Sequence, residues 1–321
     1  MEFKMVEANG LSIRVAVEGE GPLVLFVHGF PESWYSWRHQ MGPTAQAGFT
    51  AAAVDVPGYG GSDKPHAVDR YSMENLTRDM AGVARALSPD EQVVVVGHDW
   101  GAPIAWNSAL LFPDVFRAVG GLSVPYSPPG PVMFLDMIHK VFTARGKFFY
   151  QVYFQDEGVA EAELEKDPRD SIRRFYYALS GDAPDGTWPL DKKHGDSLLH
   201  RLPDPDPFPS WLTEEDLDYY EAEFKGSGFR GPVNRYRNHP RDYAFLSAVE
   251  DKRIHQPSLF IGGERDLVLQ MLPGHDPVES MKPHLPNLQV GKVLEGCGHW
   301  TQQEKPDEVN ALLIPWLKSF L

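Results

Sequence analysis

Apolar residues recur with two different periods along the first third of the chain. The alternating or continuous apolar pattern of β-strands is found at residues 11–18, 22–27, 50–56, 92–96 and 115–124. Residues 72–87 and 102–112 instead carry apolar side chains at helical spacing, and Ser72 stands before the first of these helices as a cap. Strands that alternate with helices predict an α/β fold, a mostly parallel sheet with helices on both faces.

The pattern changes near Pro125, where strand patterns stop and prolines and aromatic residues become more frequent. From there on, an extended loop is predicted at 180–210 and helices are predicted at 133–142, 147–154, 170–179 and 214–224. Strands resume at 258–261 and 290–294, and a helix at 307–321 closes the chain. We therefore interpret residues 1–125 and 242–321 as one α/β core, with residues 126–241 as a helical cap inserted before the last strands.

Residues 97–101, Gly-His-Asp-Trp-Gly, lie between a predicted strand and a predicted helix. This arrangement matches the nucleophile elbow, where two glycines allow a tight turn and the residue between them stands above the sheet at a helix N-terminus. Here that residue is Asp99. Aspartate is also a preferred helix cap, so on this turn alone capping is an equal alternative.

Asp266 and His299 each follow a later predicted strand, which completes the order nucleophile, acid, histidine of α/β-hydrolases. Parallel strands bring the loops that follow them to one edge of the sheet. The loop after strand 22–27 adds a backbone N–H donor at Phe30, and the residue after the nucleophile, Trp100, adds another. Their coincidence in the correct order favours a catalytic triad with an oxyanion hole over isolated capping or packed side chains.

Cys297 is the single cysteine, which excludes an internal disulfide and a multi-cysteine zinc site. Its place two residues before His299 leaves a Cys–His dyad as an alternative. That alternative is disfavoured, because no elbow presents the thiol.

A carboxylate at the elbow restricts the chemistry. It is ionised at neutral pH and needs no base to attack. Attack on an acyl group would give a reactive anhydride, whereas attack on a saturated carbon with a leaving group gives an ordinary ester. We therefore expect an alkylating substrate such as an epoxide or an alkyl halide, followed by ester cleavage with water that His299, oriented by Asp266, deprotonates.

Longer segments resemble the soluble epoxide hydrolases of the α/β-hydrolase fold, over nearly the whole chain. These segments are 28–34 (HGFPESW), 55–60 (DVPGYG), 97–101 (GHDWG), 150–155 (YQVYFQ), 227–232 (SGFRGP) and 297–302 (CGHWTQ). Ala102 departs from the family, where a second glycine is frequent. Mammalian members carry an additional N-terminal phosphatase domain; this chain begins with the hydrolase domain, so we expect no phosphatase activity.

The resemblance implies that Tyr150 and Tyr236 polarise and protonate the epoxide oxygen, without a cofactor or metal. On composition alone, each tyrosine is more often a packing residue. Tyr153, one helical turn after Tyr150, has no implied role and is an internal control. Supporting roles in the same motifs are assigned to His28, Pro31, His98 and Trp300.

Three rival functions are considered. Haloalkane dehalogenases typically have Asn where this chain has Phe30, and fluoroacetate dehalogenases typically have Arg where it has Trp100. A non-catalytic small-molecule receptor is disfavoured by the intact triad, and an esterase by the lack of a G-x-S-x-G motif. Chloride release measured beside diol formation separates the first class, and ligand binding without turnover identifies the second.

Net charge and composition exclude some classes of binding partner. The net charge of −15 argues against nucleic-acid binding and against attachment to anionic lipid, and 42% hydrophobic residues are ordinary for a globular protein. The apolar runs are shorter than a membrane span, and the N-terminus lacks a signal-peptide pattern. We expect a cytoplasmic protein whose partners are a small apolar epoxide and water. The oligomeric state stays open, a homodimer included.

Overall fold

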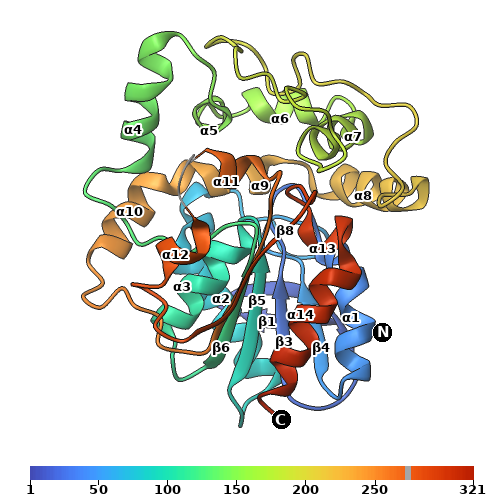
Figure 1. The fold of residues 1–321 in the computed structure, drawn as a ribbon, viewed down its shortest axis with the longest axis vertical. Helices are drawn as coiled ribbons and strands as arrows, with labels where there is room; N and C mark the ends of the chain where they lie inside the picture. Colours follow the sequence, from blue (N-terminus) through green and yellow to red (C-terminus); the bar gives the residue numbers. More distant parts are fainter. Residues whose placement is uncertain (272–275) are drawn as a thin grey trace.

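The computed structural model describes residues 1–271 and 276–321. Eight strands form one sheet in the order β1-β2-β4-β3-β5-β6-β7-β8, with helices on both faces (Figure 1). The strands are β1 (Glu2–Ala8), β2 (Leu11–Glu18), β3 (Leu23–Val27), β4 (Thr50–Val54), β5 (Val93–His98), β6 (Phe116–Leu122), β7 (Ser258–Gly263) and β8 (Leu288–Leu294). β1 and β2 pair antiparallel, as do β2 and β4, and the remaining pairs are parallel. The predicted α/β fold with a mostly parallel sheet is confirmed.

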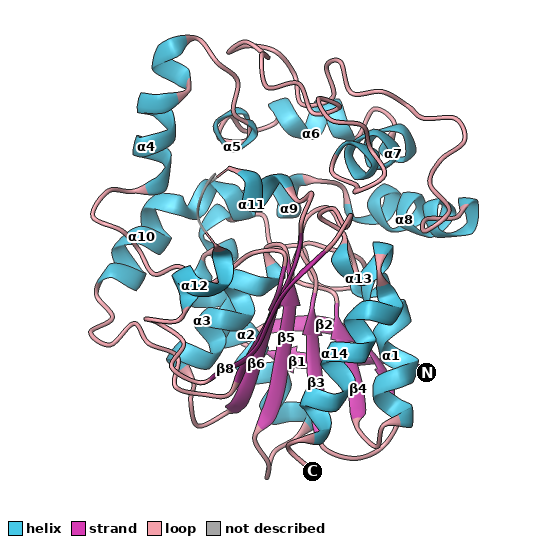
Figure 2. Ribbon diagram, in the orientation of Figure 1, coloured by secondary structure: helices cyan, strands magenta, loops and turns pink. Residues whose placement is uncertain are grey.

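Helices of the core cover the two faces of the sheet, and the strand residues alternate accordingly (Figure 2). In β5, Val93 and Val95 point into the core beneath α2 and α3, whereas Val94 and Val96 point into the core beneath α1 and α14. The helices of the core are α1 (Arg38–Gln46), α2 (Met73–Leu87), α3 (Gly101–Leu111), α11 (Leu267–Gln270), α12 (Pro277–Met281), α13 (Thr301–Glu304) and α14 (Pro306–Lys318), with 3₁₀ helices η1 (Trp34–Trp37) and η2 (Val68–Tyr71). Ser72 caps α2 as expected, since its side chain accepts from the Asn75 N–H.

The segment between β6 and β7 forms a helical layer above the carboxyl ends of the parallel strands (Figure 1). It contains α4 (Phe134–Val141), η3 (Thr143–Arg145), α5 (Tyr150–Tyr153), α6 (Val159–Leu164), α7 (Pro168–Ala178), α8 (Glu214–Ser227), α9 (Arg230–Asn234), η4 (Arg235–Asn238) and α10 (His239–Ser247). We call this layer the cap. No helix or strand interrupts residues 180–210, in agreement with the predicted loop.

Partly buried ion pairs attach α8 of the cap to the core. The Arg14 guanidinium lies 2.5 Å from Asp55 of the core and 2.5 Å from Glu223 of α8. A second pair joins Arg38 Nε to Asp216 at 3.0 Å. Because these charges pair at short range and away from bulk water, they hold α8 in a defined orientation on the core.

Two causes explain where the observed elements differ from the predicted ones. One is a backbone hydrogen bond between distant segments, and the other is a buried face without regularly spaced apolar residues. The helix expected at 147–154 is shortened to α5, because the Phe148 N–H donates to the Lys192 carbonyl and Phe149 has an extended backbone. The pattern missed α1, whose buried side chains include Gln40 and Thr44, and it missed β1, an edge strand that buries little. Among residues 1–271 and 276–321, no helix is long and apolar enough to cross a membrane.

Candidate active site

The strand–helix turn after β5 lifts Asp99 out of the sheet. Asp99 has a φ of 48°, a left-handed conformation that is uncommon outside glycine. Close packing requires the glycines on either side: a Cβ on Gly97 would overlap the Gly101 carbonyl, and a Cβ on Gly101 would overlap the carbonyl of Val27. The turn therefore has the geometry of the predicted elbow.

The two oxygens of the Asp99 carboxylate have different partners. Oδ1 accepts a hydrogen bond of 2.7 Å from the Phe30 N–H, and Oδ2 lies 3.3 Å from His299 Nε2. The following helix, α3, has no side-chain cap, so Asp99 does not serve as its cap. In the described part of the chain the Trp100 N–H makes no hydrogen bond to this carboxylate, and its place as second oxyanion donor stays a prediction.

Asp266 and His299 complete a connected triad. Both Asp266 oxygens lie 3.0 Å from His299 Nδ1, and both side chains are buried. Asp266 also caps α11 by accepting from the Val268 N–H, which restricts the rotation of its carboxylate. The imidazole is thus held with Nδ1–H on Asp266 and Nε2 toward Asp99.

Electrostatics of the triad favour an ion pair in the free protein. Burial disfavours the imidazolium, but the Asp266 and Asp99 carboxylates outweigh burial and raise the pKa of His299 well above its usual value. Burial likewise opposes ionisation of Asp99, yet the contact with His299 lowers the pKa of that carboxyl. Asp99 is therefore ionised and His299 protonated near neutral pH.

Tyr150 of α5 and Tyr236 of η4 meet above the elbow. Their ring centroids are 5.9 Å apart, and the Tyr236 ring lies 5.3 Å from Trp100 and 5.4 Å from Phe30. Burial and then nearby charge raise the pKa of both phenols, so each keeps its proton at neutral pH. Tyr153 points elsewhere, since its hydroxyl donates to Glu163 at 2.9 Å.

The four supporting residues all bind loops around the elbow. His28 bridges the Gly29 carbonyl and the Val56 N–H, and the Pro31 carbonyl accepts from the Tyr176 hydroxyl. His98 Nε2 lies 2.7 Å from the His299 carbonyl oxygen, so it contacts the catalytic loop directly. The buried Trp300 ring stacks on Tyr176 at 4.0 Å and donates to its carbonyl.

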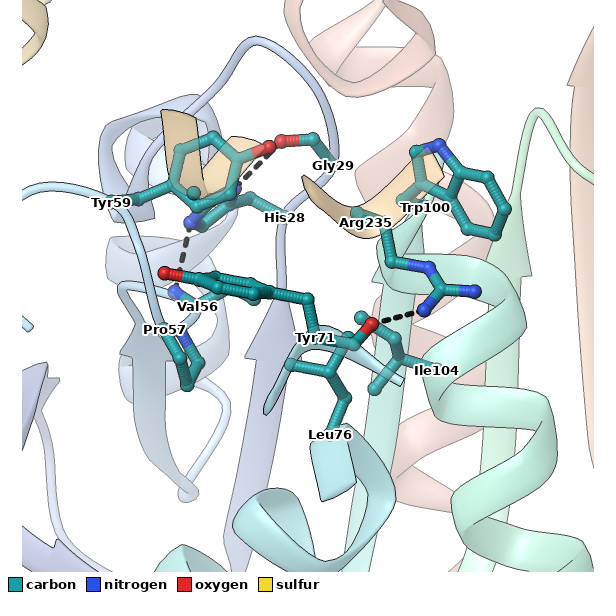
Figure 3. Close-up of a pocket in the computed structure, with 11 residues that line it drawn as sticks. His28, Gly29, Val56, Pro57, Tyr59, Tyr71, Leu76, Trp100, Ile104 and Arg235 are labelled. Atoms are coloured by element: carbon teal, nitrogen blue, oxygen red, sulfur yellow. Dashed lines mark hydrogen bonds between the residues drawn. The ribbon is translucent and has the colours of Figure 1, made fainter. Parts of the chain in front are cut away.

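A small cavity beside Trp100 is lined by Arg235 of the cap and by Tyr71 of the core (Figure 3). Arg235, the residue before Tyr236, donates to the Tyr71 carbonyl and forms an ion pair with Asp242. Its guanidinium carbon also lies 4.5 Å from the Trp100 ring centroid, at cation–π distance. These contacts set the position of η4 relative to the elbow.

Comparison with known proteins places this geometry in a family. Residues 22–306 match the family model for the alpha/beta hydrolase fold. Epoxide hydrolase A from Mycobacterium tuberculosis is 39% identical over 98% of this chain and 96% of that protein. The chain belongs to the epoxide hydrolase family. The family resemblance of its motifs is thereby confirmed.

Other epoxide hydrolases are similar in structure or over part of their length. The structure of an epoxide hydrolase from an endophytic Streptomyces has a TM-score of 0.93 and 48% identity, covering 99% of this chain and 96% of that one. Epoxide hydrolase A from Mycobacterium thermoresistibile has a TM-score of 0.92 and 40% identity, covering 99% and 98%. The rat bifunctional epoxide hydrolase 2 is 40% identical over 97% of this chain, which spans 54% of that protein.

In this epoxide hydrolase, sequence reasoning did not single out two carboxylates that hold the loops of the site, the buried Glu32 and the half-buried Glu304. Glu32 accepts from the Gly29 N–H at 2.7 Å and lies 2.8 Å from His98 Nδ1. Glu304 accepts from the N–H groups of Gly298, Trp300 and Gly181, and so joins the His299 loop to the cap. Glu32 lies inside the segment 28–34 that carries the family resemblance, whereas Glu304 gives no signal in the sequence.

The ring nitrogens of His299 face Asp266 and Asp99, which leaves none for a dyad with Cys297. Burial raises the pKa of the Cys297 thiol, and its sulfur contacts the carbonyl of Gly298. Cys297 is therefore a packing residue. Within residues 1–271 and 276–321, no group of three or more His, Cys, Asp or Glu side chains could hold a metal ion.

Proposed function

We propose that this epoxide hydrolase family member converts epoxides to vicinal diols through a covalent ester on Asp99. The observation that carries the proposal is the carboxylate at the elbow, with one oxygen on the Phe30 N–H and the other facing His299. Such a group is suited to attack a saturated carbon, because the ester that results is stable until water is activated.

In the first step, an Asp99 oxygen forms a bond to an epoxide carbon while the carbon–oxygen bond of the ring breaks. The departing oxygen takes a proton from a phenol, Tyr150 or Tyr236. The raised pKa values of these phenols support this role, since both groups stay protonated until the alkoxide forms.

In the second step, His299 changes from acid to base. Alkylation removes the negative charge of Asp99, which lies next to Nε2 and helps to keep the imidazole protonated. The proton affinity of His299 then falls, and its proton returns by way of solvent to the phenolate that ring opening produced. The neutral imidazole that remains can accept a proton from water. The remaining hydroxide forms a bond to the ester carbonyl carbon, and the carbonyl oxygen is stabilised by the Phe30 N–H and, as predicted, the Trp100 N–H. The bond from that carbon to the diol oxygen then breaks. The diol oxygen takes a proton from His299, and the Asp99 carboxyl that is regenerated returns a proton to the imidazole.

The residues around the phenols favour an apolar substrate. The ring centroid of Trp188 lies 6.3 Å from that of Tyr150, and the ring centroid of Phe154 lies 4.8 Å from that of Tyr236. Aromatic rings give the substrate apolar contact on several sides while the phenols bind its oxygen. We therefore propose substituted aliphatic or aryl epoxides as the substrate class.

A single turnover in heavy-oxygen water tests the covalent step. With enzyme in excess over the epoxide, the label should appear in the Asp99 carboxylate, because water attacks the ester carbonyl and leaves the diol unlabelled. Mass spectrometry of the peptide containing Asp99 and of the diol measures both. Label in the diol alone would show direct attack by water and contradict the ester.

The phenols are tested by replacement with phenylalanine. Tyr150→Phe and Tyr236→Phe should each slow ring opening about tenfold or more, and the double variant should lose at least about 10²-fold, the range of general acid catalysis. The rate of enzyme alkylation in a single turnover measures ring opening. Tyr153→Phe is the matched control, since its hydroxyl binds Glu163. An equal loss in that control would contradict the assignment.

A further inference from the structure

The hydroxyl of Tyr150 is the end of a hydrogen-bonded chain that crosses the cap. Gln151 Nε2 donates to the Tyr150 oxygen at 2.9 Å, and His239 Nε2 lies 2.7 Å from Gln151 Oε1. Tyr150 and Gln151 belong to α5, whereas His239 is the first residue of α10. Neither Gln151 nor His239 has a role in the two steps described above.

The chain has a defined direction of donation. An amide oxygen only accepts, so His239 Nε2 carries the proton and donates to it. The amide nitrogen at the other end of Gln151 then donates to Tyr150. Since this bond occupies a lone pair of the phenol oxygen, the O–H proton of Tyr150 is left for another acceptor.

The surroundings of His239 keep its ring neutral. Burial and the charge of Arg235 lower the pKa of His239 to about 3. The ring also lies 5.9 Å from Trp100 and 5.6 Å from Phe134, both of them uncharged. A neutral imidazole has one N–H, and here that proton points at Gln151.

We propose that His239 is a positioning residue that acts through Gln151 to direct the Tyr150 hydroxyl toward the epoxide oxygen. When the ring opens, the epoxide oxygen takes the Tyr150 proton and the phenol oxygen becomes negative. The hydrogen bond that the Gln151 side chain already donates to this oxygen then becomes stronger and stabilises the phenolate. The inference rests on the proposed role of Tyr150.

Two substitutions at His239 test the hydrogen-bonded chain from His239 through Gln151 to Tyr150. His239→Phe keeps a ring between Trp100 and Phe134 but removes the N–H, so alkylation should slow about tenfold, as for a lost hydrogen bond to a group that becomes charged. His239→Gln places an amide N–H near the same point and should restore the rate to within about twofold. Ester hydrolysis should not change, because Tyr150 acts only in ring opening. His139→Phe, at an exposed histidine of α4, is the control.

The same substitutions in a Tyr150→Phe background separate positioning from structural damage. Without the hydroxyl, His239→Phe should cause no further loss. Loss that persists there, equal slowing of both steps, or an unchanged alkylation rate in His239→Phe alone would overturn the inference. If Tyr150→Phe itself leaves alkylation unchanged, it is the proposed function of Tyr150 that fails.

Nitrogen NMR of the unsubstituted protein gives a second test that does not depend on a variant folding. It distinguishes the two neutral tautomers of a histidine. A proton on Nε2 of His239 is expected. A proton on Nδ1 would require a reversed Gln151 amide that accepts from Tyr150, and it would overturn the inference.

Discussion

Asp99→Ala will abolish diol formation, with turnover falling by about 10⁴-fold or more, as when a catalytic nucleophile is removed. The loss should be this large because no other side chain of the site can replace the carboxylate: Cys297 is buried with a raised pKa, and His299 would lose one of its two acceptors. Diol release from an apolar aryl epoxide, followed by chromatography, measures the effect.

Asp90→Ala is the matched control, because Asp90 is exposed on the loop before β5. It should retain the turnover of the parent protein. The melting temperature of each variant shows that the fold is kept. Turnover of Asp99→Ala within about tenfold of the parent would contradict a nucleophilic role, since removal of a nucleophile costs far more.

His299→Gln will stop the reaction halfway and trap the ester. Glutamine can still donate to Asp266, but it cannot take a proton from water, so ester hydrolysis should fall by about 10⁴-fold. Alkylation should continue, because it needs an ionised Asp99 and the two phenols, and none of these is replaced. Loss of the imidazolium leaves burial less opposed and so raises the pKa of Asp99, and alkylation is therefore measured at about pH 8, where ionisation of the carboxylate is favoured.

The trapped ester is measured as an increase in the mass of the intact protein equal to the mass of the epoxide. The double variant Asp99→Ala/His299→Gln is the control and should show no increase. A mass increase that persists in the double variant would place the alkylation elsewhere. Continued diol release from His299→Gln at the parent rate would show that another base activates the water.

Local patterns predicted most of the core. Periodicity located β2 to within its observed bounds and α2 to within one residue, because each buries one face and so repeats its apolar residues regularly. It missed α1, because the buried face of this helix includes the polar side chains of Gln40 and Thr44 and so does not form a continuous apolar stripe. It also extended α5 too far, because pairing of Phe148 with Lys192, 44 residues away, is not a local signal.

Candidate site residues were likewise recognisable where a local motif contains them and were missed where they act through distant contacts. The elbow was recognisable because its glycines are required by backbone contacts within the turn and with β3, and these recur as a short motif. Glu304 had no such motif. It acts by binding N–H groups from two distant loops, a relation that only the folded chain contains.

The sequence by itself determined that a carboxylate stands at a strand–helix turn, with an acid and a histidine after later strands, and from these residues we predicted alkylation followed by hydrolysis. Tertiary structure alone decided the distances and protonation states: the 3.3 Å contact of Asp99 with His299, the meeting of Tyr150 and Tyr236, and the chain from His239 to Tyr150. The physical reason is the distance along the sequence between the groups that interact. Residue type and backbone turn are encoded locally, whereas a hydrogen bond or a pKa depends on groups that packing brings together from distant parts of the chain.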